Sequence, residues 1–327
     1  MFERLKLLLG PTKSREVGLR VRKTMAGIES KLISKNIKLP FAPIFIIGLP
    51  RSGTTLLYQV MTKCLKMCYF NNLTDHFPKS PVLVSLLTSP FNGNRPHGDF
   101  SSYYGETIGW NAPSQGGLIW REWFGEDPCY IAAGLLDAKA QHEIRNTLAL
   151  MEMPFRAPFV NKWPVNSVRI LAFAEIFPEA VFIRTHRNRL MVAQSILYGR
   201  KEFWGDSGAW LSAKPSNYEN IKSKSNIDQV CEQIFYVEKD MDRDSKIVGL
   251  ERFLSIDYEQ LCSSPADIIN KIRGFYAATP HGCNLLSRSD VPKQFPFSTT
   301  IKINRKEYES LRVCMKKLYQ HKHDKTL

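Results

Sequence analysis

The first clear pattern in the chain is an unbroken run of four apolar residues, Ile-Phe-Ile-Ile, at positions 44–47. Prolines precede this run and Gly48 ends it. A short run of β-branched and aromatic residues between such boundaries is typical of a strand buried on both faces. From Thr54 onward the apolar residues instead recur at helical spacing, at Leu56, Leu57, Val60 and Met61. The pattern therefore predicts a strand, a turn over residues 48–53 and a helix.

The same alternation returns over residues 167–199. Here the pattern predicts a helix that ends at Ile176, just before Pro178, then a strand from Ala180 to Ile183 and a second helix from Leu190 to Leu197. Repeated strand-to-helix alternation is typical of parallel sheets that are covered by helices. We therefore expect an α/β fold with a parallel sheet flanked by helices.

Between these two units lies a segment of different composition, residues 71–130, which is rich in Gly, Pro, Ser, Asn and aromatic residues. We expect a long irregular insertion of this kind to act as a lid or a substrate loop. The first 38 residues and residues 302–327 read as basic helices. The chain thus divides into a basic helical N-terminal extension (1–38), one α/β domain (39–301) and a basic helical C-terminal tail (302–327).

The net charge of +14 is concentrated at the two ends of the chain. Residues 1–38 carry +7 and residues 302–327 carry +5, which leaves only +2 for the centre. Basic ends of this kind can bind an anionic membrane surface or a polyanionic substrate, and solvated basic helices are the alternative. The ends do not interleave aromatic and base-reading residues, so we expect no nucleic-acid partner.

Overall composition, 43% hydrophobic and 23% charged, is that of a globular protein. We find no uninterrupted run of 18 apolar residues, and the apolar patch near the N-terminus is too short for a signal peptide. We therefore expect a cytoplasmic protein, with peripheral attachment at the inner membrane face left open by the basic ends. The seven cysteines are scattered without a C-x-x-C pair, which predicts free thiols and no metal site.

The turn after the first strand has the glycine spacing of a phosphate-binding loop. The nucleotide-binding pattern is G-x-x-x-x-G-K-[ST], and Gly48 and Gly53 fit it, but Thr54 occupies the lysine position. Thr55 stands where a magnesium-ligating hydroxyl would be. The fixed charge of the loop comes from Arg51, whose guanidinium can bind two oxygens at once. Because a helix N-terminus also presents free N–H groups here, the loop predicts an anion site.

A second anion site is predicted at the end of the second strand. Arg187 follows that strand, and Ser195 lies eight residues later in the next helix. We expect both to reach the carboxyl edge of the sheet, where open α/β folds bind their ligands. Two phosphate sites without the γ-phosphate lysine suit a nucleotide that is phosphorylated at two places.

Two stretches, "GLPRSGTTLL" at 48–57 and "FIRTHRNRLMVAQSIL" at 182–197, resemble the sulfotransferases that use 3′-phosphoadenosine 5′-phosphosulfate. The resemblance continues in "PFVNKW" at 158–163 and in "IDYEQLCSSPADIINKIRGFY" at 256–276. It implies sulfuryl transfer to a hydroxyl acceptor, with 3′-phosphoadenosine 5′-phosphate as product and no required metal. It also implies that Arg187 and Ser195 hold the 3′-phosphate and that Tyr258 contacts the cofactor. The residues implied for the 5′-phosphosulfate are Pro50, Arg51, Ser52, Gly53, Thr54 and Thr55.

Sulfuryl transfer needs a base for the acceptor proton and cations for the leaving phosphate. We expect Lys162 to join Arg51 as the second cation. Where many members of the family have Arg-Asp-Pro, this chain has Arg187-Asn188-Arg189, and the 111–115 stretch lacks the acidic residues that a related bacterial group leads us to expect. For the base, Glu106 therefore ranks first, followed by His76 and Asp75, with Glu122 and Asp127 as further candidates.

The acceptor that we expect is a small molecule, a glycan or a glycolipid, because the insertion is rich in aromatic residues that can stack on sugar or lipid faces. Two other interpretations remain open at this point. One is a kinase with an altered phosphate-binding loop, which the absence of the loop lysine disfavours. The other is an inactive sulfotransferase-like scaffold that docks on an anionic membrane through its basic ends. The aromatic residues in question are Tyr103, Tyr104, Trp110, Trp120 and Trp123.

Overall fold

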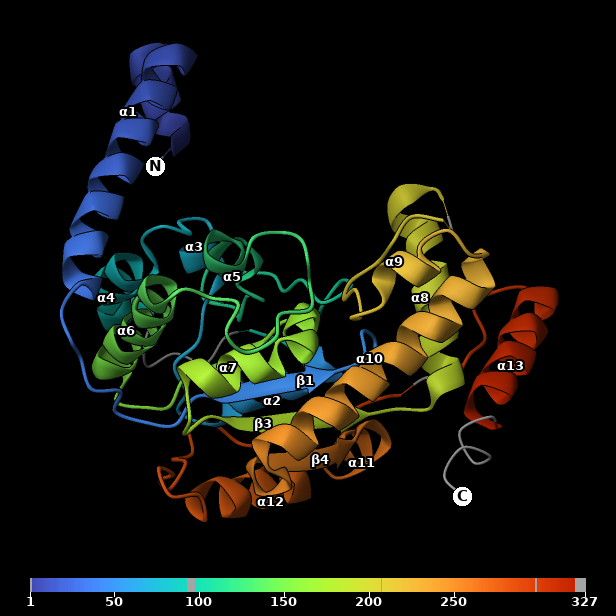
Figure 1. Cartoon of the computed structure of the whole chain (residues 1–327). Helices are drawn as coiled ribbons and strands as arrows, with labels where there is room; N and C mark the ends of the chain where they lie inside the picture. The colour runs from blue at the N-terminus through green and yellow to red at the C-terminus, as the bar shows by residue number, and fades with distance from the viewer. Residues whose placement is uncertain (1, 93–97, 207, 298, 321–327) are drawn as a thin grey trace.

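The computed structural model describes residues 2–92, 98–206, 208–297 and 299–320 (Figure 1). Its strands are β1 (Ile44–Gly48), β2 (Val160–Lys162), β3 (Val181–His186) and β4 (Phe253–Asp257). Its α-helices are α1 (Phe2–Ile33), α2 (Thr54–Cys64), α3 (Asn72–Asp75), α4 (Pro81–Asn92), α5 (Gly117–Phe124), α6 (Ala138–Phe155), α7 (Ile170–Ile176), α8 (Arg189–Trp204), α9 (Tyr218–Ile221), α10 (Asn226–Val248), α11 (Tyr258–Ser263), α12 (Pro265–Ala277) and α13 (Arg305–Gln320). Two short 3-10 helices are η1 (Pro164–Val168) and η2 (Leu250–Arg252).

The described strands form one parallel sheet in the order β2-β1-β3-β4. Strand β1, the most hydrophobic, lies inside the sheet, where Phe45 faces Asn161 of β2 and Phe182 of β3 in register. Every residue of β1 is buried, as a strand covered on both faces requires. The α/β fold with a parallel sheet flanked by helices is therefore confirmed.

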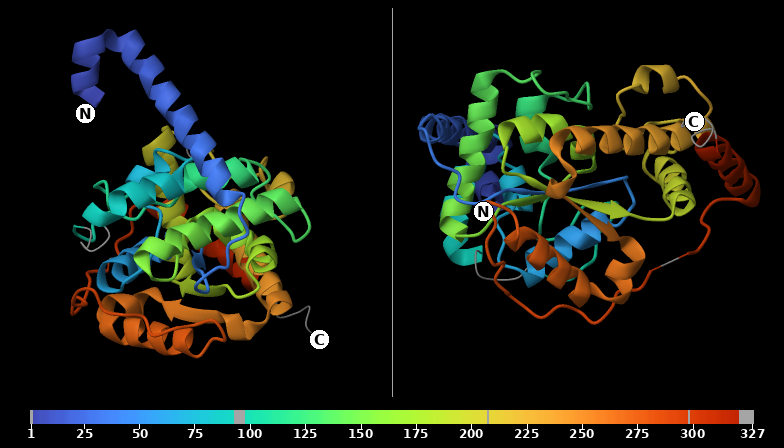
Figure 2. Two further views of the ribbon diagram at one scale, coloured as in Figure 1. Left: turned by 90° about the vertical axis from the view of Figure 1, so that its left-hand side faces the viewer. Right: turned by 60° about the horizontal axis from the view of Figure 1, so that its bottom comes forward.

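Alternating side chains of the sheet feed two separate hydrophobic cores. Phe45 and Phe182 point into the first core, with α7 and α10, whereas Ile46 and Ile183 point into the second, with α2 and α12. Figure 2 shows these helix pairs on opposite sides of the sheet. Because each fully buried side chain of this size contributes about 1.5–3 kcal/mol to stability, the two cores hold the strands rigidly.

The carboxyl ends of all four strands meet at one edge of the sheet. Strand β3 continues to His186, beyond the predicted end at Ile183, because Arg184, Thr185 and His186 pair with neighbouring strands although they are polar. Helix α8 begins directly afterwards, with Asn188 as its N-cap, and extends past the predicted Leu197 to Trp204. This edge therefore carries polar residues that a hydrophobic pattern does not reveal.

Two buried carboxylates hold helices against neighbouring segments of the chain. Glu152 of α6 accepts hydrogen bonds from the backbone N–H groups of Phe41 and Phe159, which precede β1 and β2. Glu29 of α1 accepts from the N–H groups of Val82 and Leu83 in the first turn of α4. Burial raises the pKa of Glu152 to about 8 and that of Glu29 to about 7.

The segment 71–130 is more ordered than its composition predicts. It contains α3, α4 and α5, because the apolar run from Val82 to Leu87 forms a helix and Trp120 of α5 is fully buried in the first core. Residues 98–116 are largely without regular structure. The prediction of an irregular insertion therefore applies to the stretch that passes over the carboxyl edge of the sheet, and not to the whole segment.

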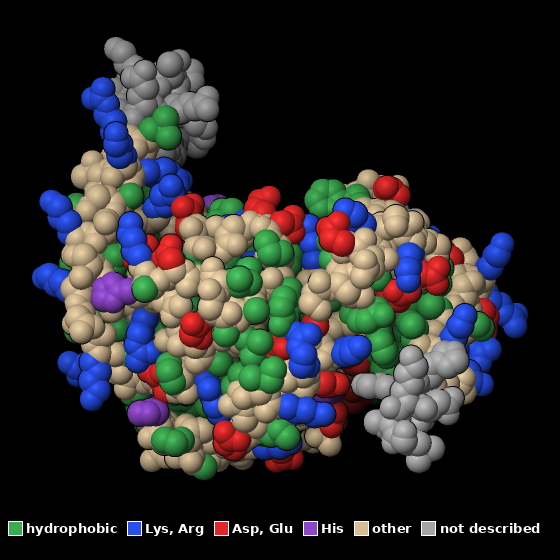
Figure 3. All heavy atoms as spheres, in the orientation of Figure 1, with side chains coloured by type: hydrophobic (Ala, Val, Ile, Leu, Met, Phe, Trp, Pro, Cys, Tyr) green, Lys and Arg blue, Asp and Glu red, His purple; other side chains and the backbone are tan. Residues whose placement is uncertain are grey.

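Helices α1 and α13 are the first and last described elements, and they lie at opposite sides of the molecule (Figures 1 and 2). Helix α1 reaches away from the body, and Ile33 at its end is buried in the first core. Helix α13 buries Leu311 and Met315 in the same core. Figure 3 shows lysine and arginine side chains gathered along α1 and near α13. Among the described residues, no helix is long and apolar enough to cross a membrane.

Candidate functional site

A cavity of about 780 Å³ opens at the carboxyl edge of the sheet. One part of its wall is the loop after β1, with Arg51, Thr54 and Thr55, together with Arg187 after β3 and Tyr258 after β4. The 102–106 stretch and Lys162 line its middle, and residues 121–129 and 203–218 line the rest. Strand ends, the insertion and the connection between α8 and α10 thus enclose one space.

The loop after β1 is held in shape by its glycines and by hydroxyl groups beneath it. Gly48 and Gly53 have φ of 149° and 93°, and Arg51 also has a positive φ of 70°. Ser167 Oγ donates to Gly48 O and accepts from Gly48 N–H, both at 2.9 Å. A side chain at Gly48 would collide with Thr185, since an added Cβ would lie 2.5 Å from its Oγ1. The glycine is therefore required for the loop to pass this close to β3.

Ser52 faces the sheet and not the cavity. Its hydroxyl is fully buried, donates to Leu49 O at 2.7 Å and lies 2.7 Å from Thr185 Oγ1. The side chain thus stabilises the loop from below, and only the backbone of Ser52 is left to face an anion. Thr54 is also buried, whereas Thr55 is half-buried; both line the cavity together with Pro50 and Gly53.

The two arginines predicted to bind phosphate lie together. Arg51 Nε donates to Ser195 Oγ at 3.0 Å, and Arg187 Nη1 donates to the carbonyl oxygen of Arg51 at 3.0 Å. The guanidinium of Arg51 stacks on Tyr104, and that of Arg187 stacks on Tyr258, with 4.7 and 4.5 Å to the ring centroids. Burial is the main cause that lowers the pKa of Arg51, and Arg187 adds to it. Like charges held this close suit an anion between them.

Lys162, Gln115 and Glu106 form a hydrogen-bonded chain across the middle of the cavity. Lys162 Nζ donates to Gln115 Oε1 at 3.1 Å, and Gln115 Nε2 donates to Glu106 Oε1 at 2.6 Å. Lys162 is almost fully buried, and burial lowers its pKa to about 7, with Arg51 acting in the same direction and Glu106 against it. Gly105 lets the insertion approach, because its added Cβ would lie 3.2 Å from Lys162 Nζ.

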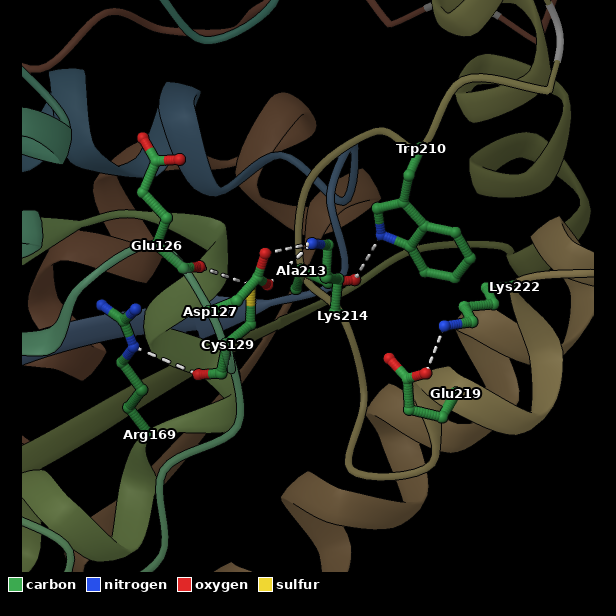
Figure 4. Close-up of polar contacts among 9 residues, drawn as sticks. All are labelled: Glu126, Asp127, Cys129, Arg169, Trp210, Ala213, Lys214, Glu219 and Lys222. Atoms are coloured by element: carbon green, nitrogen blue, oxygen red, sulfur yellow. Dashed lines mark hydrogen bonds and ion pairs between the residues drawn. The ribbon is translucent and has the colours of Figure 1, made fainter.

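The other candidate bases lie elsewhere or already have partners. His76 is exposed and does not line the cavity; its ring lies 6.1 Å from that of Trp110. Asp75 accepts from Ser114 Oγ and from the N–H of Leu118, and so stabilises the start of α5. Glu122 pairs with Lys79 outside the cavity. Asp127 does line the cavity and forms an ion pair with Lys214 (Figure 4).

Several residues of the site carry no signal in the sequence. Ser167 and Thr185 support the phosphate-binding loop, but they are small polar residues far from it along the chain. Gln115 lies in the stretch where an acidic residue was expected, and it joins Glu106 to Lys162. Lys214 belongs to the connection after α8, for which no function was predicted. Only the contacts across the fold identify these four residues.

Within the described part of the chain, no group of three or more His, Cys, Asp or Glu side chains is placed to hold a metal ion. All seven cysteines are free thiols. The basic side chains that line the cavity are Arg51, Lys162 and Arg187 at the loop end and Arg121 and Lys214 farther along.

Comparison with known proteins agrees with this arrangement. A model described as "Sulfotransferase family" matches residues 43–277. Crystal structures of sulfotransferases from Mycobacterium avium and Mycobacterium tuberculosis superpose with TM-scores of 0.51 and 0.52, each at 14% sequence identity. The alignments cover 92% and 79% of this chain and 72% of each of those chains, and they show the shared fold. No curated protein matches the chain. The family match spans every strand of the sheet and most of the residues that line the cavity, and the chain belongs to the sulfotransferase family.

Proposed function

We propose that this protein transfers a sulfuryl group from 3′-phosphoadenosine 5′-phosphosulfate to a hydroxyl acceptor. The observation that carries the proposal is the junction of Arg51, Arg187 and Ser195, which the fold brings together from the ends of β1 and β3. Two arginines and the N-terminus of α2 at one place suit a ligand with more than one phosphate. The first turn of α2 contains no acidic residue that would repel such a ligand.

The residues of the phosphate-binding loop fit the 5′ end of this donor. In this proposal the backbone N–H groups at the start of α2, the Thr55 hydroxyl and the Arg51 guanidinium hold its phosphosulfate. In this proposal Arg187 and Ser195 hold the 3′-phosphate; the packing of Tyr258 on Arg187 supports this role. The bound donor supplies the sulfuryl group and the leaving phosphate. Arg51 and Lys162 supply the positive charge in place of a metal ion.

Glu106 and Lys162 perform the proton and charge chemistry in this proposal. Glu106 takes the proton of the acceptor hydroxyl as the new oxygen–sulfur bond forms and the bond from sulfur to the 5′-phosphate breaks. Lys162 and Arg51 neutralise the charge that develops on the leaving phosphate. Gln115 holds Glu106 and Lys162 in position, since its amide contacts both.

The acceptor is a small molecule, a glycan or a glycolipid. Tyr104, Trp163, Phe203, Trp204 and Trp210 line the cavity and can pack against a sugar or lipid face. Polar groups lie between these rings, as in sites that orient a ligand by a few specific hydrogen bonds.

The test is calorimetric titration of the full chain with 3′-phosphoadenosine 5′-phosphate, and separately with ATP and magnesium. We expect the bisphosphate to bind in the micromolar range and ATP not to compete. Arg187→Ala should weaken the bisphosphate by roughly 10- to 100-fold, because a hydrogen bond to a charged group contributes about 1.5–3 kcal/mol.

Arg189→Ala is the matched control, since Arg189 lies two residues away but pairs with Glu238 at 2.8 Å and stacks on Tyr319. It should leave bisphosphate binding unchanged. Tight binding of ATP, or equal losses from both arginine variants, would contradict the proposal. The first of these outcomes would favour a kinase, and absence of binding to either nucleotide would favour a scaffold.

A further inference from the structure

The part of the cavity beyond Lys162 has a composition different from that of the phosphate end. Its charged side chains form pairs: Lys214 Nζ lies 2.7 and 2.8 Å from the two carboxylate oxygens of Asp127, and Arg121 lies 3.6 Å from Glu126. Figure 4 shows Asp127 and Lys214 facing each other from two segments far apart in the sequence. The Asp127 side chain is 60% exposed, so one face of this pair is open to a ligand.

Aromatic rings line the cavity together with the Asp127–Lys214 pair. Trp163, Trp204, Trp210 and Tyr218 line the same cavity, and Lys214 Nζ also lies 4.8 Å from the ring centroid of Tyr218. Trp204 is 61% exposed, so the aromatic wall reaches the mouth of the cavity. The flat faces of these rings offer apolar contact, and the charged pair beside them offers hydrogen bonds.

Buried polar side chains hold both segments in place from behind. Arg169, which is fully buried, donates to Cys129 O at 3.2 Å and stacks between Phe124 and Trp163. On the other segment, Gln233 donates to the carbonyls of Leu211 and Ala213, each at 2.8 Å. Because these segments are already fixed, they lose little conformational entropy when a ligand binds.

The ring of Trp210 is fixed in the same way. Its Nε1 lies 3.4 Å from Ala213 O, as drawn in Figure 4, and the buried guanidinium of Arg200 lies 5.0 Å from its ring centroid. Trp210 is thus part of the framework and not a loose surface side chain.

From this geometry we infer that the region around Asp127, Lys214 and Trp210 is an acceptor subsite for a glycoside ring. This inference rests on the proposed function and specifies its acceptor. Asp127 can only accept hydrogen bonds and Lys214 can only donate them, whereas each hydroxyl of a sugar does both. A pair of neighbouring hydroxyls therefore matches the ion pair, and the apolar face of the ring packs on Trp210.

A phenol fits this subsite less well. It has a single hydroxyl, which must stand at Glu106 to react, so nothing remains to satisfy the charged pair. Placing an apolar ring against Asp127 and Lys214 would remove water from both charges without replacing the hydrogen bonds, which is unfavourable. The charged pair thus favours a polyhydroxyl acceptor over an aromatic alcohol.

The test is titration of the full chain with methyl β-D-glucopyranoside, methyl β-D-galactopyranoside, methyl α-D-mannopyranoside and phenol. Saturation-transfer NMR and tryptophan fluorescence report binding, with the protein free and saturated with 3′-phosphoadenosine 5′-phosphate. We expect at least one glycoside to bind saturably and more tightly than phenol. Asp127→Asn should weaken it by roughly 10- to 100-fold, since it loses a hydrogen bond to a charge.

Lys222→Gln is the matched control. Lys222 lies eight residues beyond Lys214 and forms an ion pair with Glu219 (Figure 4). Neither Lys222 nor Glu219 lines the cavity. We expect this variant to bind the glycoside as the wild type does. Asp127→Asn should also keep the wild-type affinity for the bisphosphate, which shows that the fold and the phosphate end are intact.

The two proposals fail in different ways. A wild-type protein that does not bind the bisphosphate overturns the proposed function, and the titrations of the free protein still test the subsite. Bisphosphate binding without saturable glycoside binding, tighter binding of phenol, or equal losses from Asp127→Asn and Lys222→Gln would each overturn the acceptor subsite alone.

Discussion

Lys162 is the residue at which burial and charge conflict most sharply. It is almost fully buried, lies near Arg51 and is linked to the carboxylate of Glu106 through Gln115. These surroundings lower its pKa to about 7, with burial as the main cause. A polyanionic ligand in the cavity would reverse this effect and return the lysine to its charged form.

Binding of 3′-phosphoadenosine 5′-phosphate should therefore depend on pH through Lys162. Above about pH 7 the free protein has a neutral lysine that must take up a proton on binding, so affinity should fall by up to about tenfold per pH unit. Below this pH the lysine is already charged and contributes no slope. Calorimetry in buffers of different ionisation enthalpy measures the proton uptake directly.

Lys162→Met is the comparison for this prediction. The variant keeps the size of the side chain but has no titrating group, so its affinity should be lower and should lack the loss above pH 7. Ionisation of the ligand phosphates affects both proteins equally. An unchanged slope in Lys162→Met would show that another group takes up the proton.

The same lysine should affect stability in the opposite sense to its effect on binding. Its folded pKa lies below the ordinary value, so the unfolded chain binds more protons between about pH 7 and 10. Its contribution to the free energy of unfolding therefore rises with pH across this window and is absent from Lys162→Met. Because stability rises with pH while affinity for the bisphosphate falls, the two pH effects of Lys162 can be told apart.

Glu106→Gln should test the catalytic base. The change preserves the shape of the side chain but removes the group that takes the proton, so kcat should fall by about 10²- to 10⁴-fold. Affinity for the bisphosphate should stay near the wild-type value. His76→Ala should change neither quantity, because His76 lies outside the cavity. A larger loss of kcat in His76→Ala than in Glu106→Gln would overturn this assignment.

At the scale of elements, the phosphate-binding loop depends on its contact with α11. Tyr258, the first residue of α11, packs directly over Gly53, where an added Cβ would lie 2.2 Å from Tyr258 Cδ2. The same ring stacks on Arg187. The absence of a side chain at Gly53 thus allows Tyr258, at the junction of β4 and α11, to pack on Arg187.

Gly53→Ala should disrupt this support. We expect it to lower the free energy of unfolding by about 1–3 kcal/mol more than Gly125→Ala, because overpacking adds to the backbone strain. Gly125 is a suitable control: it also has a positive φ, of 69°, but an added Cβ would meet nothing within 4 Å. Chemical denaturation of both variants measures the difference. Equal losses would mean that Tyr258 moves aside freely.

The pattern of hydrophobic residues predicted the strands and helices that have a strong local signal in the sequence. It did not predict the elements that lack such a signal. Strand β1 and helix α2 were predicted because an apolar run changes to helical spacing at a glycine loop. Strand β2 was not predicted as a strand, since it is only three residues long and includes Asn161 and Lys162. Its pairing with β1, which the sequence of β2 alone does not encode, determines its conformation.

The residues of the candidate site also fall into two groups, those that could be predicted from the sequence and those that could not. Arg51, Arg187 and Ser195 could be predicted because each follows or lies near a recognisable strand end, and the structure brings them together. Gln115 and Lys214 could not, because their positions depend on how the insertion and the connection after α8 cross the sheet edge. Side chains carried by irregular segments acquire their roles only through tertiary contacts.

For the whole molecule, the separation of the two basic ends bears on membrane contact. Helix α13 packs one face on the body, whereas α1 reaches away from it and exposes Leu19, Val21 and Ile28. Basic residues accompany these apolar side chains in α1, among them Arg20 and Lys23, which are exposed. Exposed apolar groups and positive charge together are what an anionic lipid surface binds. We therefore propose α1 as the end that contacts a membrane.

The prediction is a difference between two variants that each remove two charges. Arg20→Gln with Lys23→Gln should weaken binding to phosphatidylcholine vesicles that contain phosphatidylglycerol by roughly tenfold or more, because each charge near the surface contributes about 1 kcal/mol. Lys316→Gln with Lys317→Gln, on exposed positions of α13, should have little effect. Sedimentation with vesicles at two salt concentrations measures both, and wild-type binding should weaken as salt screens the charges. Equal losses of vesicle binding in the two variants would show that total charge, rather than α1, determines attachment. Absence of vesicle binding by the wild type would contradict the proposal and leave solubility as the role of the basic ends.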